Sequence, residues 1–136
     1  MWARDLGDDL YELHNTPFYA YDLNYLDVVY AVSDDPNRKP LIQRVERRSG
    51  HRTLRVVFDN SIPAPQRPIQ LKALDKFGVT WEGSNATLFA LDIADSGNYQ
   101  AVCDQLWEWE NAGILGYETC EARVLGSFDA EPEHSN

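Results

Sequence analysis

The order of strand-like and helix-like stretches after residue 52 restricts the fold more than any other feature of this chain. Read by hydrophobic period and turn residues, they run strand, helix, strand, strand, helix, strand, at residues 53–58, 66–77, 79–82, 86–93, 98–112 and 117–125. This order is the signature of a split β-α-β unit. We therefore expect an α+β fold with a ferredoxin-like β-α-β-β-α-β unit over residues 51–125.

Both predicted helices carry an apolar stripe and end at a glycine, Gly78 for the first and Gly113 for the second. Glycine is favoured just after a helix because it adopts the left-handed backbone conformation without a steric cost. The residues of the two stripes, which we expect to be buried, are Leu71, Leu74, Phe77, Val102, Leu106 and Trp109.

Residues 1–50 are predicted to form an N-terminal antiparallel β subdomain, in which residues 9–48 read as short strands separated by turns. The stretches at 26–32 and 41–48 flank the turn-forming residues 33–37 and predict a hairpin. Several such strands predict a small antiparallel sheet or partial barrel preceding the ferredoxin-like unit. Residues 126–136 are polar and acidic, and we expect a disordered tail there.

The net charge of −10 is distributed unevenly. Residues 1–76 hold eleven acidic and eleven basic side chains, whereas residues 77–136 hold eleven acidic side chains and a single basic one, Arg123. Such a surface repels nucleic-acid backbones and attracts cationic partners. We therefore expect a basic protein partner and no nucleic-acid ligand.

The chain contains no apolar run long enough for a membrane span and no apolar stretch of a signal peptide near its first residue. We therefore expect a cytoplasmic protein that makes no membrane contact. In a reducing cytoplasm, Cys103 and Cys120 are expected to be buried free thiols. The sequence leaves the oligomeric state open.

Two segments of the chain resemble a known family. Residues 10–21 read LYELHNTPFYAY and are followed by Asp27, Val28 and Val29, whereas residues 48–55 read RSGHRTLR. These blocks resemble a bacterial family described as domain of unknown function 4265. The resemblance spans about residues 2–124 and implies a bacterial cytosolic protein. It brings no catalytic residues to this chain.

No catalytic, metal or cofactor signature is present. His14, His51 and His134 are scattered, and neither cysteine belongs to a C-x-x-C pair. His51 lies in a cationic run with arginines 44, 47, 48, 52 and 55, and arginine is well suited to hold a small anion. Alternation along a strand divides this run between two faces, and we expect part of it to pair with acidic residues.

A ligand cleft and a partner-binding surface are the two candidate sites. The cleft would lie between the second sheet and the N-terminal strands, lined by Tyr19, Tyr21, His51 and Arg52. The partner-binding surface would lie on the second helix. It comprises an aromatic residue among carboxylates, namely Asp104, Trp107, Glu108 and Glu110.

Two functions follow from these candidates. The first is a non-enzymatic binding protein, for example an immunity protein or antitoxin, that neutralises a basic toxin through its acidic surface. The alternative is a small-molecule-binding domain, or an enzyme with a weak signature, that uses the cleft. Polar residues converging on one pocket would favour the alternative. A convex acidic surface around Trp107 with no cleft would favour the binding protein.

Overall fold

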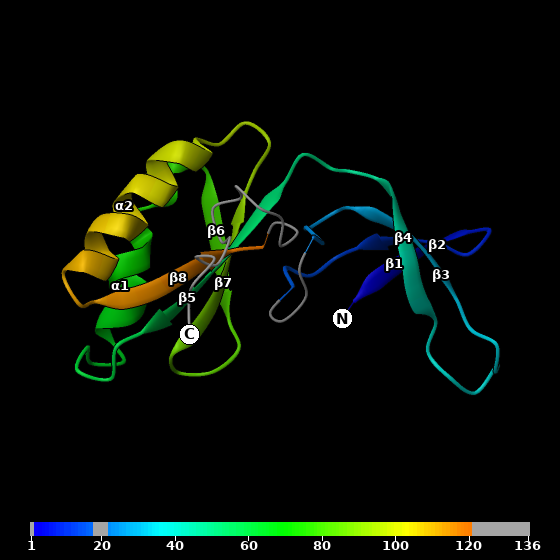
Figure 1. Cartoon of the computed structure of the whole chain (residues 1–136), viewed down its shortest axis with the longest axis horizontal. Helices are drawn as coiled ribbons and strands as arrows, with labels where there is room; N and C mark the ends of the chain where they lie inside the picture. Colours follow the sequence, from blue (N-terminus) through cyan, green and yellow to red (C-terminus); the bar gives the residue numbers. More distant parts are fainter. Residues whose placement is uncertain (1, 18–21, 121–136) are drawn as a thin grey trace, which may run out of the picture.

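The computed structural model describes residues 2–17 and 22–120, which form two lobes side by side along the long axis of the molecule (Figure 1). Each lobe contains one four-stranded sheet, with strand orders β1-β2-β3-β4 and β6-β7-β5-β8. All strand pairs in both sheets are antiparallel. A linker at residues 48–51 joins the N-terminal lobe to the C-terminal lobe.

The N-terminal lobe consists of four strands and confirms the predicted small antiparallel sheet. The strands are β1 (Ala3–Gly7), β2 (Leu10–Leu13), β3 (Val28–Val32) and β4 (Leu41–Arg47). The pair β3–β4 is the hairpin expected around residues 33–37. Register shifts interrupt the pairs β1–β2 and β3–β4. Irregularities of this kind bend a strand and increase its twist, which suits a small curled sheet.

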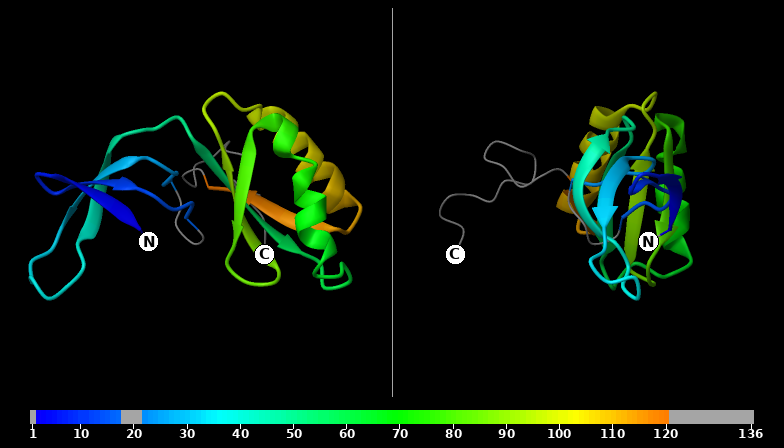
Figure 2. Two further views of the ribbon diagram at one scale, coloured as in Figure 1. Left: turned by 180° about the vertical axis from the view of Figure 1, so that it is seen from behind. Right: turned by 90° about the vertical axis from the view of Figure 1, so that its right-hand side faces the viewer.

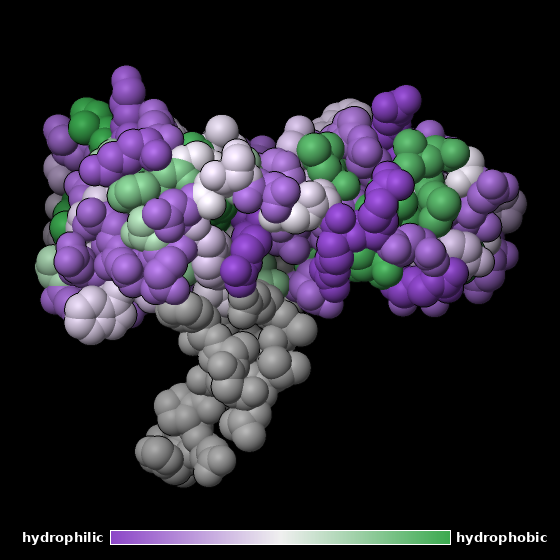
Figure 3. Space-filling view, turned by 90° about the horizontal axis from the view of Figure 1, so that it is seen from above, coloured by the Kyte–Doolittle hydropathy of each residue, from purple (hydrophilic) through white to green (hydrophobic). Residues whose placement is uncertain are grey.

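No helix covers the N-terminal sheet within the described residues, and parts of its apolar surface face solvent. In Figure 3, separate hydrophobic patches lie over this lobe between hydrophilic side chains. Leu41 of β4 is 71% exposed, and Trp2 beside β1 is 77% exposed.

The C-terminal lobe packs two helices on one face of its sheet (Figure 2). Its elements are β5 (Arg52–Phe58), α1 (Gln66–Lys72), the short 3-10 helix η1 (Asp75–Phe77), β6 (Val79–Gly83), β7 (Leu88–Ile93), α2 (Tyr99–Asn111) and β8 (Leu115–Thr119). Alternate strand residues, such as Leu54, Val56 and Phe58 of β5, join the core cluster beneath the helices. The intervening residues, such as Thr53 and Arg55, belong to the opposite face of the sheet.

The two helical stripes pack into the core as predicted, but the structure differs from the prediction in the burial of two residues and in the length of the first helix. Leu71, Leu74, Val102 and Leu106 are fully buried. Phe77 and Trp109 are only partly buried and pack against the edge of the cluster. The first helix is shorter than predicted, because it ends at Lys72 and the chain continues through η1. Gly78 follows η1 with φ +82°, which is the expected glycine stop.

The described structure is an α+β fold, as the sequence predicts. No helix in the described residues is long and apolar enough to cross a membrane. Both cysteines are buried free thiols, as expected. The predicted tail at 126–136 lies outside the described residues.

Candidate functional site

Buried polar residues concentrate where the two lobes meet. The described residues include seven that are polar or charged and buried, and five of these lie at this junction: Thr16, Asp27, Thr53, Arg55 and Asp92. Burying a polar group costs free energy unless a partner compensates for it. Of all parts of the described structure, the polar junction therefore has the composition that core packing explains least.

Strand alternation turns three of these residues away from the helices. Thr53 and Arg55 of β5 alternate with the core residues Leu54 and Val56, and Asp92 of β7 lies directly opposite Thr53. Arg55 donates from Nε to Oε1 of Glu118 on β8, at 3.0 Å. Strand alternation therefore gives the sheet a polar face toward the junction and an apolar face toward the helices.

A pocket of about 340 Å³ opens at this junction. Its walls come from the loop that precedes β3, from the linker, from the start of β5 and from the first residue of α2. Gly50 in the linker has φ +90°, and a Cβ there would lie 2.6 Å from Oδ1 of Asp95. A glycine at position 50 therefore allows the linker to approach the loop between β7 and α2 closely.

His51 lines the pocket and is oriented by Asp92. Its Nδ1 lies 2.9 Å from both carboxylate oxygens of Asp92, and the ring of Tyr25 makes an edge contact at 5.3 Å. Burial raises the pKa of Asp92, and the hydrogen bond from His51 acts in the opposite direction. The imidazole is therefore fixed at the pocket wall by a buried carboxylate.

The two arginines of the pocket are also engaged. Arg48 contacts Oδ2 of Asp22 at 2.9 Å and Oδ2 of Asp27 at 3.4 Å. The guanidinium of Arg52 lies 3.5 Å from the centroid of the Tyr99 ring, a cation–π geometry. The predicted cationic run is therefore not one anion site, because its members point to different acidic and aromatic partners.

Thr53 is a buried polar residue beside the pocket. It is 2% exposed, and its Oγ1 has no hydrogen-bond partner in the described structure. A buried hydroxyl without a partner is costly, so such a group calls for an explanation.

We expect the substitution Thr53→Val to raise the free energy of unfolding by about 1 kcal/mol, because it removes an unpaired hydroxyl and keeps the side-chain shape. Urea denaturation measures the change, and Thr80→Val, at an exposed position of β6, serves as the control. A loss of stability in Thr53→Val would mean that the hydroxyl has a partner in solution.

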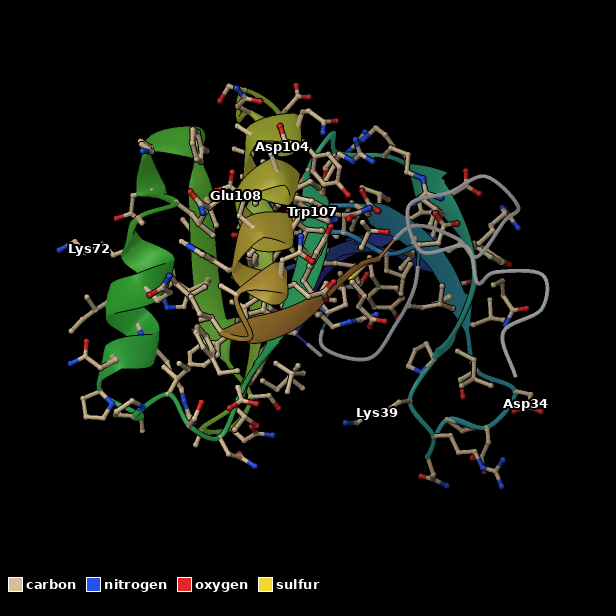
Figure 4. All side chains as sticks on the ribbon, turned by 60° about the vertical axis from the view of Figure 1, so that its left-hand side comes forward. Asp34, Lys39, Lys72, Asp104, Trp107 and Glu108 are labelled. Atoms are coloured by element: carbon tan, nitrogen blue, oxygen red, sulfur yellow. The ribbon has the colours of Figure 1, made fainter. Side chains whose placement is uncertain are left out.

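The second candidate, the outer surface of α2, lies on the far side of the C-terminal lobe. Asn98 caps this helix by accepting a hydrogen bond from the backbone N–H of Ala101, at 3.0 Å. Figure 4 shows Asp104, Trp107 and Glu108 along the helix. Trp107 is 58% exposed and is not part of the core.

The carboxylates of α2 make no ion pair with any described residue. Asp104 accepts a hydrogen bond from Gln100 at 2.8 Å, and Glu110 accepts one from the backbone N–H of Tyr117 at 3.2 Å. Both carboxylates keep their charge facing solvent, as does Glu108. The four predicted residues of the partner-binding surface therefore share one exposed region.

The predicted ligand cleft is only partly described. His51 and Arg52 both line the junction pocket, whereas Tyr19 and Tyr21 lie outside the described residues. Sequence reasoning missed Asp92 and Thr53. A signal for Asp92 was available, since an acidic residue within the otherwise apolar strand LFALDI is unusual unless it has a buried partner. No group of residues suited to hold a metal ion occurs in the part of the chain that the structure describes.

Comparison with known proteins identifies a family and a fold. The family model for a domain of unknown function (DUF4265) matches residues 1–117. A crystal structure of a hypothetical protein from Neisseria gonorrhoeae is similar in fold, with a TM-score of 0.73 and 17% sequence identity. The match covers 85% of this chain and 77% of that chain. No curated protein matches. The chain therefore belongs to the DUF4265 family.

Proposed function

We propose that this protein is a small-molecule-binding domain whose ligand occupies the junction pocket. The observation that carries the proposal is the convergence of polar side chains on one pocket, in particular His51, which is held in place by Asp92. A pocket of about 340 Å³ suits a small ligand. This is the alternative that the sequence left open, and the pocket now favours it over the acidic surface.

The test is retention of small molecules from a metabolite extract of the source organism, measured by equilibrium dialysis and mass spectrometry. We expect the wild-type protein to retain a compound that Arg52→Ala loses, because Arg52 lines the pocket. Arg47→Ala removes an equally charged, exposed side chain of β4 and serves as the control. Retention that is equal in both variants, or absent from the wild type, would rule out the pocket as the binding site.

A second function has an observation of its own. Trp107 is exposed on a helix that carries Asp104, Glu108 and Glu110 and no basic residue. Large aromatic side chains at the centre of a polar rim are typical hot spots of protein interfaces. Trp107 and the carboxylates around it therefore support a function in which this protein binds a basic protein, for example as an immunity protein or antitoxin.

In that case Trp107→Ala should weaken partner binding by about 2 kcal/mol or more, roughly thirtyfold, mainly through faster dissociation. Glu108→Lys should slow association and reduce its dependence on salt. The controls are Trp2→Ala, at another exposed tryptophan, and Asp34→Lys, on the β3–β4 loop of the other lobe (Figure 4). A partner captured from lysate supports this function only if the controls keep it and the α2 variants lose it.

We also propose a ferredoxin-like topology for the C-terminal lobe. The element order β5-α1-β6-β7-α2-β8 and the sheet order β6-β7-β5-β8 support it. We propose in addition that the protein is cytoplasmic. Its two buried cysteines form no disulfide, which is typical of proteins in a reducing compartment.

A further inference from the structure

The N-terminal sheet carries a pocket of its own, of about 350 Å³, on one of its faces. Residues that pair across neighbouring strands point to the same side of a sheet, so side chains from different strands converge there. Three such pairs line this N-terminal pocket, namely Ala3 with Leu13, Tyr11 with Val29, and Ala31 with Ile42. None of its described lining residues also lines the junction pocket.

The N-terminal pocket leaves large apolar side chains in contact with water. Leu13, Val29 and Ala31 are buried beneath it, whereas Trp2 is 77% exposed and Ile42 is 41% exposed. Exposing apolar surface to water costs free energy, and apolar side chains gathered at a pocket are typical of a binding site for an apolar group. We therefore expect the body of the ligand to be apolar.

Lys39 is the one charged residue among the described residues that line this pocket. It is exposed, and no ion pair joins it to another described residue. The carboxylate of Asp35, in the same loop, pairs instead with Arg38 at 3.8 Å. Figure 4 shows the side chains of Lys39 and Asp34 on opposite sides of the β3–β4 hairpin. The ammonium group is therefore available to a negative charge on the ligand.

A single lysine matches a single negative charge. Its ammonium is a compact point charge on a flexible stem, whereas a phosphate group carries almost two charges and is best held by the fork of an arginine. The net charge of the whole chain is −10, which opposes the binding of polyanions. Among anionic groups, one carboxylate therefore suits this pocket best.

We propose that the N-terminal pocket binds a small apolar carboxylate. The apolar body of the ligand covers Trp2 and Ile42, and its carboxylate pairs with the ammonium group of Lys39. The inference goes beyond the proposed function and does not depend on it, because it concerns a different pocket.

The probes are 3-phenylpropionate and octanoate, which offer an aromatic and an aliphatic body. Their comparisons are 3-phenylpropanamide, which is neutral, and acetate, which has no large apolar body. Each is titrated into the full chain while the indole N–H of Trp2 and the methyl groups of Ile42 are followed by NMR. We expect at least one of the two larger carboxylates to give a saturable shift at both residues, with weaker binding of the amide and of acetate. Trp107, on the outer surface of α2, is the internal control and should not shift.

Four variants separate the charge from the apolar contact. Lys39→Gln should weaken carboxylate binding by about two- to fivefold, the effect of one exposed ion pair, and leave amide binding unchanged. Lys72→Gln removes an exposed lysine of α1 and should change neither (Figure 4). Ile42→Ala should weaken binding of both probes. Leu41→Ala alters the preceding residue, which is exposed on the opposite face of β4, and should not weaken it.

The absence of a saturable shift at Trp2 and Ile42 with both larger carboxylates would exclude this ligand class. An unchanged affinity in Lys39→Gln, or equal affinities for 3-phenylpropionate and its amide, would overturn the ion pair and with it the carboxylate. Equal losses in Ile42→Ala and Leu41→Ala would place the binding outside this pocket. These outcomes leave the proposed function untouched, since its test is the retention of a metabolite that Arg52→Ala loses.

Discussion

The substitution Leu106→Ala is expected to lower the free energy of unfolding by about 2–5 kcal/mol. Leu106 is the central residue of the buried stripe of α2 and is 0% exposed. It belongs to the core cluster together with Leu71 of α1 and Leu91 of β7. Alanine would remove its apolar contacts and leave a cavity that close-packed neighbours fill only in part. Urea denaturation followed by circular dichroism measures the loss.

Ile69→Ala is the matched control. Ile69 is an aliphatic residue in the other helix of the same lobe, but it is 63% exposed. Its replacement should change the free energy of unfolding by no more than about 0.5 kcal/mol. Equal losses in the two variants would contradict the placement of Leu106 in the core.

The second helix was predicted almost to the residue, at 98–112 against the observed Tyr99–Asn111. Its local signals agree with its packing, since Asn98 caps it, the stripe Val102 and Leu106 is buried, and a glycine follows. The first helix was predicted too long. The chain from Ala73 to Phe77 keeps the apolar spacing but continues as a tighter turn, which a stripe of three residues does not distinguish from an α-helix.

Strand β1 was not predicted. All of its residues, Ala3–Gly7, are exposed, so the sequence shows no alternation there. The strand exists because a tight turn returns it to β2, with Asp8 and Asp9 at positive φ. An edge strand of this kind depends on its partner, and a single sequence does not contain that information.

Of the pocket, the sequence predicted His51 and Arg52, because they stand in a conspicuous polar run next to a turn. It did not predict Asp92, which hydrogen-bonds to His51, or Thr53, which lines the same pocket. Asp92 lies 41 positions from His51 in the chain, and Thr53 looks like an ordinary strand residue. Only the antiparallel pairing of β5 with β7 brings these side chains to one face. The exposure of Trp107 likewise depends on how α2 lies on the sheet.

The substitution Asp27→Ala is expected to lower the free energy of unfolding by roughly 3–5 kcal/mol, the range for removing one partner from a buried charged network. The Asp27 side chain is 0% exposed. Its Oδ1 accepts from the backbone N–H of Ser49 at 2.8 Å, and its Oδ2 accepts from the backbone N–H of Asn24 at 3.0 Å and contacts Arg48. The carboxylate therefore joins the loop before β3 to the linker between the lobes.

Alanine at position 27 would leave two backbone N–H groups without their acceptor and Arg48 with Asp22 as its remaining acidic partner. Asp34→Ala removes an exposed carboxylate of the same lobe and should change the free energy of unfolding by no more than about 0.5 kcal/mol. Asp27→Asn keeps one carbonyl oxygen and should fall between the two. If Asp27→Ala is no more destabilising than Asp34→Ala, then the linker is not held by Asp27. The pocket, which takes part of its wall from that linker, would then lack the rigid frame that ligand binding requires.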